Sequence, residues 1–262
     1  MKDWALILGA SSGFGRATAI ELSRRGFHIL GIHFDTKATI ENAIKTKEEV
    51  EKNGVKAEFF NINAGDEKKM NQVLDEFQNK YPDAKIRVLM HSIAFGTLVP
   101  FIAEKREEAI KRKQLEMTLH LMANTLVYWT QEVFYRNLFL SPGGRIFAMT
   151  SEGSLRVTKH YGAVSGAKAL IESHIRQLAL ELAPYGITAN AIMAGVTDTP
   201  ALRKIPGHEN IVEFTLKRNP SGRLTTPEDV AKAIAGFTSR DFDWMTGNII
   251  HIDGGEIIAG IE

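Results

Sequence analysis

The sequence predicts an α/β fold, with seven parallel strands in a doubly wound sheet and helices on both of its faces. Short apolar runs recur along the 262 residues, and longer amphipathic stretches separate them, as is typical of βαβ units. The glycine-rich and polar motifs fall where these runs end, at the edge where such sheets bind ligands. The length fits one large domain, residues 1–262, better than two small ones.

Each expected element follows from the apolar pattern and from the turn residues that bound it. The apolar run at 5–8 predicts the first strand, and the glycine-rich turn after it predicts the start of a helix. Helix 68–80 ends near Pro82, and the proline-glycine turn at 141–144 ends a long helical region. The expected elements are, in order, strand 5–8, helix 16–25, strand 27–34, helix 40–53, strand 55–62, helix 68–80, strand 88–91, helix 107–140, strand 145–149, helix 164–182, strand 188–192 and strand 248–252.

The composition indicates a small-molecule partner. The 32 basic residues nearly balance the 31 acidic ones, a net charge of +1, so the chain has no bulk attraction to nucleic acid. Because there is no cysteine, a disulfide scaffold, a thiolate metal site and a cysteine nucleophile are excluded, and we expect no metal. No run approaches the roughly 18 to 20 apolar residues of a membrane helix, and the first is too short for a secretory signal. We therefore expect a cytoplasmic protein without membrane contact.

A glycine-rich turn between the first strand and the first helix is one candidate site. Gly9 comes where the strand ends, and Gly13 and Gly15 come where the helix begins. Glycine permits a tight turn and lets backbone N–H groups approach a pyrophosphate at the helix N-terminus. The candidate cofactor-binding residues of this turn are Gly9, Ser11, Ser12, Gly13, Phe14 and Gly15.

A tyrosine and a lysine in the middle of the chain form the second candidate site. Tyr161 and Lys168 stand seven positions apart at the opening of an expected helix. Seven steps make nearly two turns, so the phenol and the ammonium share a face about 10 Å apart along the axis. A ribose fits between them. With the glycine-rich turn, the pair indicates hydride chemistry on a nicotinamide cofactor.

The Gly-x3-Gly-x-Gly spacing resembles that of the short-chain dehydrogenase/reductase family, and the resemblance runs the whole length of the chain. It implies a Rossmann sheet and a nicotinamide dinucleotide. Three further segments resemble the family's motifs: the pair that flanks the adenine, the segment after the fourth strand, and the turn that holds the carboxamide and pyrophosphate. By this resemblance the cofactor-binding residues also include Asn63, Ala64, Ser92, Ile93, Ala94, Lys168, Gly195, Val196 and Thr199.

The spacing of the tyrosine and the lysine resembles one branch of that family. Most members place the tyrosine four residues before the lysine, a position that here is Val164. Tyr161-x6-Lys168 instead resembles the enoyl-acyl-carrier-protein reductases, in their NADPH-using bacterial form. The resemblance implies that a homotetramer reduces the trans-2,3 double bond of an enoyl thioester in fatty acid biosynthesis. Acyl carrier protein or coenzyme A would carry the thioester.

This resemblance assigns three catalytic residues. Tyr161 would hydrogen-bond the enolate oxygen as its charge develops. Lys168 would hold the ribose hydroxyls, and its charge would favour partial ionisation of the phenol. Ser151 stands where family members carry a catalytic serine or, in many enoyl reductases, a second tyrosine. It either orients the substrate or caps the turn that follows its strand.

Two other functions stay open. The first is a carbonyl or alcohol oxidoreductase of the same fold, such as a 3-oxoacyl reductase, acting through Ser151 and Tyr161. Activity on acetoacetyl rather than crotonyl thioester would favour it. The second is a regulatory protein that binds the cofactor without turnover. The presence of both Tyr161 and Lys168 argues against a pure sensor, which has no need of the phenol.

The form of the cofactor depends on the end of the second strand. A carboxylate there hydrogen-bonds the ribose 2′-OH and repels a 2′-phosphate. By family register that position is His33, and Arg16 and Lys37 can also offset phosphate charge, so NADPH is favoured. Asp35, two positions further along, keeps NADH open.

A segment at 197–220 is expected to cover the substrate. Prolines and a glycine interrupt an otherwise apolar stretch there, and loops this long in compact domains are usually functional or mobile. The alternative is an ordinary surface loop. Its apolar side chains either line an acyl chain or pack within a small helix, and they are Leu202, Ile205, Ile211, Val212, Phe214 and Leu216.

Overall fold

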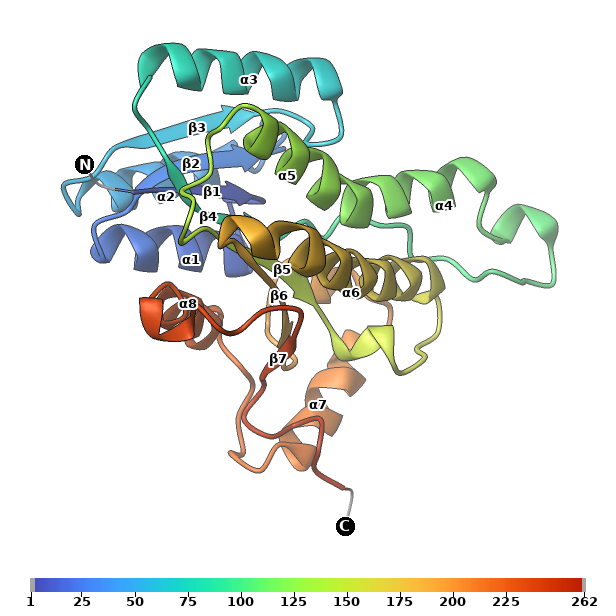
Figure 1. Ribbon diagram of the computed structural model, residues 1–262. Coiled ribbons are helices and arrows are strands. Elements are labelled where there is room, and N and C mark those ends of the chain that lie inside the picture. The colour runs from blue at the N-terminus through green and yellow to red at the C-terminus, as the bar shows by residue number, and fades with distance from the viewer. Residues whose placement is uncertain (1–2, 261–262) are drawn as a thin grey trace.

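The computed structural model describes residues 3–260 (Figure 1), so the expected domain limits at 1 and 262 lie outside the described residues. Seven parallel strands form one sheet in the order β3-β2-β1-β4-β5-β6-β7. The doubly wound α/β fold is therefore confirmed, with every expected strand present. The strands are β1 (Trp4–Leu8), β2 (His28–His33), β3 (Ala57–Asn61), β4 (Ile86–His91), β5 (Arg145–Thr150), β6 (Thr188–Ala194) and β7 (Ile249–Ile252).

Helices cover both faces of this sheet. Figure 1 shows α3, α5 and α6 on one side and α1 and α8 on the other. The α-helices are α1 (Gly13–Arg24), α2 (Ile40–Glu51), α3 (Glu67–Lys80), α4 (Arg112–Leu119), α5 (Thr125–Tyr135), α6 (Gly162–Leu182), α7 (His208–Arg218) and α8 (Pro227–Gly236).

Strand β1 shows how the sheet joins two cores. Trp4, Leu6 and Leu8 point into the core under α3, α5 and α6. Ala5 and Ile7 point into the core under α1, α2 and α8. Every residue of β1 is buried, because a central parallel strand is covered on both faces. That is why its sequence is a continuous apolar run.

The strand order places a crevice beside β1. The chain runs from β1 outward to β2 and β3, then crosses back so that β4 pairs with the other edge of β1. The loops after β1 and β4 therefore diverge to opposite faces at their carboxyl ends. Ligands of doubly wound sheets bind at this switch point.

The expected helix at 107–140 is wrong as one continuous element. A short 3-10 turn (Arg106–Glu108) precedes α4, and a π-helical turn (His120–Asn124) joins α4 to α5. The helix ends at Tyr135 because Asn137 adopts a left-handed conformation, with φ of 54°. The following residues then pair with Ile86 at the start of β4, through backbone hydrogen bonds of 2.8 and 2.9 Å.

Helices α7 and α8 were not among the expected elements. The start of α8 has a sequence signal. Thr226 and Asp229 form an N-terminal capping box, and Pro227 occupies the first turn of the helix. Thr226 Oγ1 accepts from the Asp229 N–H at 3.2 Å, and the Asp229 carboxylate accepts from the Thr226 N–H at 2.9 Å. The Arg223 guanidinium lowers the pKa of Asp229 to about 2, so the cap stays ionised at neutral pH.

Replacing the capping hydroxyl tests this account of α8. Thr226→Ala should lower the free energy of unfolding by about 1 kcal/mol, because an N–H of the first turn loses its partner. Urea denaturation followed by circular dichroism measures it. Thr226→Ser keeps the hydroxyl and is the matched control. Equal stability of the alanine and serine variants would contradict a role for the cap.

Candidate active site

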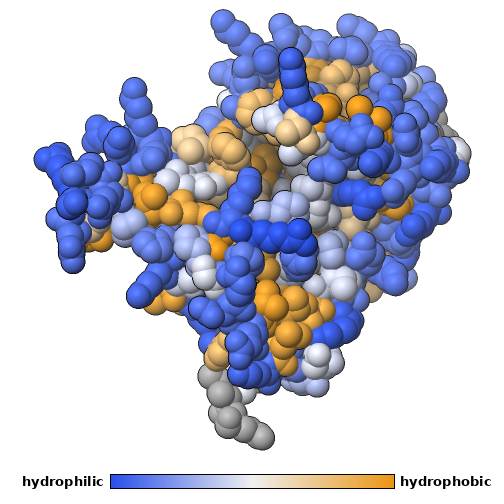
Figure 2. Space-filling model, turned by 180° about the vertical axis from the view of Figure 1, so that it is seen from behind, coloured by the Kyte–Doolittle hydropathy of each residue, from blue (hydrophilic) through white to orange (hydrophobic). Residues whose placement is uncertain are grey.

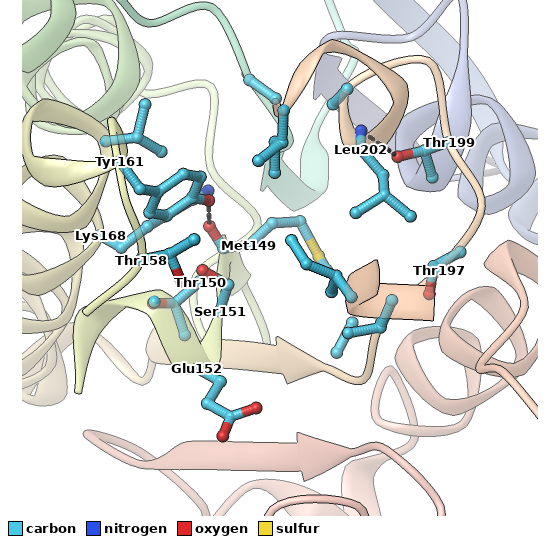
Figure 3. A pocket seen from close by; sticks show the side chains of 18 of the residues that line it. Met149, Thr150, Ser151, Glu152, Thr158, Tyr161, Lys168, Thr197, Thr199 and Leu202 are labelled. Carbon is cyan, nitrogen blue, oxygen red and sulfur yellow. Dashed lines mark hydrogen bonds between the residues drawn. The ribbon is translucent and has the colours of Figure 1, made fainter. Parts of the chain in front are cut away.

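A cavity of about 670 Å³ opens at the carboxyl edge of the sheet (Figure 3). Its walls come from the start of α1, from the loops after β4, β5 and β6, and from the first turns of α6. Part of the segment 197–220 also lines it. Figure 2 shows a hollow with apolar side chains around it. The cavity therefore lies at the switch point that the topology creates.

The glycine-rich turn lets α1 and the loop after β4 approach closely. Gly9 has φ of +92°, and a Cβ there would lie 2.4 Å from the Ser92 carbonyl oxygen. A Cβ on Gly15 would lie 2.0 Å from the Gly9 carbonyl oxygen. Ser12 precedes α1 but makes no side-chain cap, so the first N–H groups of the helix are not capped by it. This arrangement fits the pyrophosphate of a dinucleotide.

Most of the expected site residues line this one cavity. They come from segments far apart in the sequence, and the fold brings them together as expected for a shared site. The residues at the cavity are Ser12, Gly13, Phe14, Ser92, Ile93, Ala94, Ser151, Tyr161, Lys168, Gly195, Val196 and Thr199.

Six expected residues lie outside the cavity lining, namely Gly9, Ser11, Gly15, His33, Asn63 and Ala64. Gly9 and Gly15 shape the turn beneath it. Asn63 Oδ1 accepts from the Gly65 N–H at 2.9 Å, and the Ala64 carbonyl accepts from Trp129 Nε1 at 2.9 Å. These bonds hold the turn after β3. Contact of Asn63 and Ala64 with an adenine stays a prediction.

Tyr161 and Lys168 lie at the start of α6, and Figure 3 shows them on the same side of the cavity. Tyr161 immediately precedes the helix, and Lys168 is buried. Lys168 Nζ donates to the Met149 carbonyl at the end of β5, at 2.7 Å. Burial lowers the pKa of Lys168 to about 8, partly opposed by the charge of Glu172 one turn further along.

Burial is the main influence on the phenol of Tyr161. Burial raises the pKa of Tyr161 above its ordinary value, and the neighbouring Ser151 hydroxyl offsets part of the rise. The ring rests against Gly153, where a Cβ would lie 2.5 Å from Tyr161 Cε1. With its pKa above the ordinary value, the phenol is neutral at pH 7 and can donate a hydrogen bond. Partial ionisation favoured by the charge of Lys168 stays a prediction.

Ser151 is available to a ligand. It precedes the 3-10 turn Glu152–Ser154 but makes no side-chain cap, so the capping role considered from the sequence is wrong. Its Oγ is buried and has no hydrogen-bond partner within the described residues. A buried hydroxyl without a partner costs free energy, which a bound polar group would recover.

Near the end of β2 there is less positive charge available to bind a 2′-phosphate than the sequence indicates. His33 Nδ1 lies 2.9 Å from Asp35 Oδ2, and burial lowers the pKa of His33 although Asp35 opposes it. The histidine is therefore neutral at pH 7. Arg16 Nη2 is bonded to Glu49 Oε1 at 2.6 Å. Lys37 is exposed.

The segment 197–220 contains a 3-10 turn (Leu202–Lys204) and α7. Leu202, Ile205, Ile211 and Phe214 line the cavity, as expected for a substrate cover. Two other apolar residues of the segment, Val212 and Leu216, do not, and Leu216 is 44% exposed.

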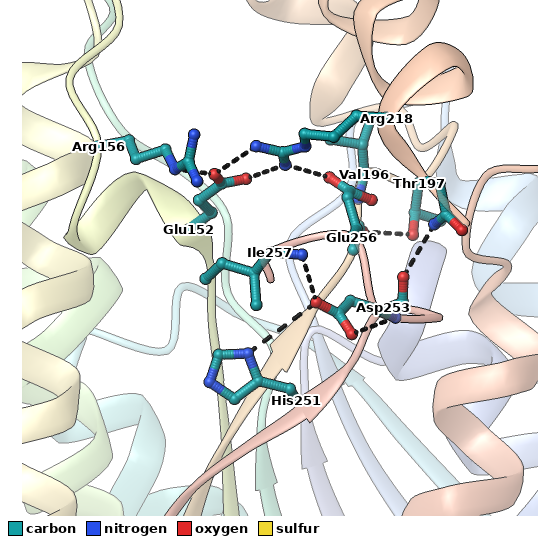
Figure 4. Close-up of polar contacts among 12 residues, drawn as sticks. Glu152, Arg156, Val196, Thr197, Arg218, His251, Asp253, Glu256 and Ile257 are labelled. Atoms are coloured by element: carbon teal, nitrogen blue, oxygen red, sulfur yellow. Dashed lines mark hydrogen bonds and ion pairs between the residues drawn. The ribbon is translucent and has the colours of Figure 1, made fainter. Parts of the chain in front are cut away.

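Four charged residues at the cavity were missed from the sequence. They are Glu152, Arg156, Arg218 and Glu256, and Figure 4 shows them in contact with one another. Glu152 and Arg218 are 66 positions apart, so no local pattern links them. Only the topology brings them together.

Other classes of site are not indicated within residues 3–260. No group of three or more histidine, aspartate or glutamate side chains there is placed to hold a metal ion. None of the helices of this part of the chain is both long and apolar enough to cross a membrane.

Known proteins resemble this chain over most of its length. An uncharacterised oxidoreductase of Bacillus subtilis, YjdA, is 32% identical over 97% of this chain and 96% of its own. The 1-cyclohexenylcarbonyl-CoA reductase of Streptomyces collinus is 29% identical over 97% of this chain and 86% of its own. The crystal structure of the NADH-dependent enoyl-[acyl-carrier-protein] reductase of Aquifex aeolicus has a TM-score of 0.85 at 24% identity, covering 99% of this chain and 98% of its own.

The family described as enoyl-(acyl carrier protein) reductase matches residues 9–256, which include the glycine-rich turn, the Tyr161 and Lys168 pair and the whole cavity. This protein therefore belongs to that family, within the short-chain dehydrogenase/reductase oxidoreductases.

Proposed function

We propose that this protein reduces the C2=C3 double bond of an enoyl thioester with hydride from a nicotinamide dinucleotide. One observation carries the proposal. Most members of the family that the sequence resembles have their tyrosine four residues before the lysine. In this chain that position is Val164, whose side chain is buried. The phenol comes instead from Tyr161 at the start of α6, as in the branch that the sequence resembles.

The side chains of the cavity supply what this reaction needs. When bound, the reduced nicotinamide supplies hydride to C3 of the substrate. Negative charge then develops on the thioester oxygen, where the neutral phenol of Tyr161 donates a hydrogen bond. Lys168 Nζ has two donors left beyond its bond to Met149 for the ribose hydroxyls. Ser151 Oγ orients the thioester, and a proton from water completes C2.

The cavity walls favour an acyl chain. Ile211 and Phe214 of α7 face the cavity from one side, and Leu98 and Met122 line it elsewhere. The name of the Streptomyces relative describes an alkene conjugated to a coenzyme A thioester. That is the same reacting bond and the same activating group as in the enoyl thioester proposed here. Acyl carrier protein or coenzyme A carries the substrate, and the pathway is fatty acid biosynthesis.

We propose a homotetramer as the working form. Tyr128 and Tyr135 on α5 and Leu180 on α6 are large, apolar and exposed, at 41%, 78% and 71%. Exposed apolar side chains on neighbouring helices are typical of surfaces that pack against another subunit.

A carbonyl reductase is the second candidate. The observation that favours it is Ser151 Oγ, a buried hydroxyl without a partner beside the phenol. It could donate to a ketone oxygen. Relatives of lower identity include a cyclohexanol dehydrogenase and a 3-oxoacyl-[acyl-carrier-protein] reductase.

Removal of the Tyr161 hydroxyl tests the mechanism, and a comparison of two substrates separates the candidates. Tyr161→Phe should lower kcat with crotonyl thioester by about 100-fold or more, because one preorganised donor to the developing oxyanion is lost. Oxidation of NADH and NADPH at 340 nm measures it. Tyr185→Phe, on a half-exposed ring outside the cavity, is the control. Wild-type activity on acetoacetyl but not crotonyl thioester would favour the carbonyl reductase.

The pKa of Lys168 predicts how pH affects cofactor binding. Burial lowers this pKa to about 8, so the ammonium loses its proton above that pH and the dissociation constant for the dinucleotide should rise. Fluorescence titration from pH 6.5 to about 9.5 follows this change. Lys168→Arg keeps its charge over that range and should abolish the dependence. A wild-type constant that is flat across pH 8 would contradict the role.

We further propose that NADH is preferred over NADPH, contrary to the expectation from the sequence. The Asp35 carboxylate lies beside His33 just after the end of β2, and Arg16 is ion-paired with Glu49. A carboxylate at this place favours a ribose hydroxyl over a phosphate.

Two substitutions should shift this preference toward NADPH. Asp35→Asn removes the repelling charge and Glu49→Gln releases Arg16, and each should tighten NADPH relative to NADH by about tenfold. Fluorescence titration with both dinucleotides measures the ratio. Glu51→Gln, which loses only an exposed pair with Lys47, is the control. Tighter binding of NADPH by the wild type would contradict the proposal.

A further inference from the structure

Three distant segments meet in a charged cluster at the cavity (Figure 4). Arg218, the last residue of α7, donates from Nη1 and Nη2 to the two carboxylate oxygens of Glu152, at 2.9 and 2.6 Å. Arg218 Nη2 also donates to Glu256 Oε1 at 3.1 Å. Arg156 ion-pairs with Glu152 from the other side. Two positive and two negative charges therefore balance.

The centre of this cluster is buried. The side chains of Arg218 and Glu256 are 4% and 2% exposed, and that of Glu152 is 21% exposed. Burial strengthens ion pairs, and the planar guanidinium matches the Glu152 carboxylate with two parallel bonds, while Arg218 Nε has no hydrogen-bond partner within the described residues. Loss of one partner would leave the other charge buried and unpaired.

Polar contacts attach the C-terminal end of helix α7 to the rest of the protein: the ion pairs of Arg218 and the bond from Asn219 Nδ2 to the Asp253 carbonyl at 2.9 Å. Surface helices usually bury an apolar face against the core. On α7, the buried residues are Thr215 and Arg218, whereas Ile211 and Phe214 face the cavity. Because the apolar residues look into the cavity, the ion pairs of Arg218 replace the usual hydrophobic attachment.

The same cluster reaches the turn after β6. Glu256 Oε2 accepts from the Val196 N–H at 3.0 Å, while Oε1 accepts from Arg218. Val196 lies in the turn expected to hold the nicotinamide carboxamide and pyrophosphate. One carboxylate therefore joins the helix over the cavity to the cofactor turn.

We propose that Arg218 is a positioning residue, whose ion pairs with Glu152 and Glu256 anchor α7 over the cavity and couple it to the turn at Val196. The consequence for acyl chains rests on the proposed function, whereas the anchor does not. A long acyl chain contacts Ile211 and Phe214, so a displaced helix weakens long substrates more than short ones.

Two variants test the anchor. Arg218→Lys keeps the charge but loses the two-pronged contact with Glu152. The triple variant Arg218→Met, Glu152→Gln, Glu256→Gln removes the buried charges together, and the only charge of the cluster that it leaves is that of Arg156, which is 54% exposed. Lys217→Met is the matched control, because Lys217 neighbours Arg218 on α7 but is 73% exposed and pairs only with Glu213.

Limited chymotrypsin digestion measures how firmly α7 is held, and it does not require the protein to be active as an enzyme. Cleavage after Phe214 or Leu216, identified by mass, should be about tenfold faster in both variants than in Lys217→Met. The KM ratio of 2-octenoyl-CoA to crotonyl-CoA should rise by about fivefold in both variants and stay at the wild-type value in Lys217→Met. A purely structural role would lower the melting temperature and leave this ratio unchanged.

Equal cleavage rates in all three variants, measured well below their melting temperatures, would overturn the anchor. An unchanged KM ratio with faster cleavage would overturn the link to the acyl chain. Absence of turnover by the wild type would contradict the proposed function alone, because the cleavage rates still decide whether Arg218 holds the helix.

Discussion

The buried ammonium of Lys168 is the constraint around which the site is arranged. Its bond to the Met149 carbonyl ties the second turn of α6 to the end of β5. The charge of Glu172, one turn further on, opposes the lowering of the Lys168 pKa by burial. Glu172 also accepts a hydrogen bond from the Thr150 hydroxyl at 2.6 Å. Tyr161 precedes the same helix and Ser151 follows the same strand. The three polar groups therefore meet because α6 and β5 are joined there.

The fold could be predicted because its signals are local. A central parallel strand is buried on both faces, so β1 reads as an uninterrupted apolar run. The glycines of the first turn are required by close backbone approaches, as the position of Gly9 against Ser92 shows. The Tyr161 and Lys168 spacing follows from helical geometry alone. Each of these leaves a signal within a short stretch of sequence, even where, as for Gly9 and Ser92, the contact itself joins distant positions.

Features that depend on distant partners could not be predicted. The helix expected to reach residue 140 stops because Asn137 turns left-handed and the next residues pair with Ile86. The pKa of Tyr161 depends on burial that no spacing reveals. The charged anchor of α7 joins residues 66 and 38 positions apart, and neither separation has a sequence pattern. Helix α8, by contrast, has a capping box at Thr226 and Asp229 from which its start could be predicted.

The central claim is that hydride reaches C3 of an enoyl thioester beside the phenol of Tyr161. The most direct measurement uses a dinucleotide deuterated at C4 of the nicotinamide, crotonyl thioester as substrate, and NMR of the product. The account predicts deuterium at C3 of the butyryl product in the wild type and a large loss of that transfer in Tyr161→Phe. Transfer to a carbonyl carbon of an oxoacyl substrate, with none to crotonyl C3, would contradict it.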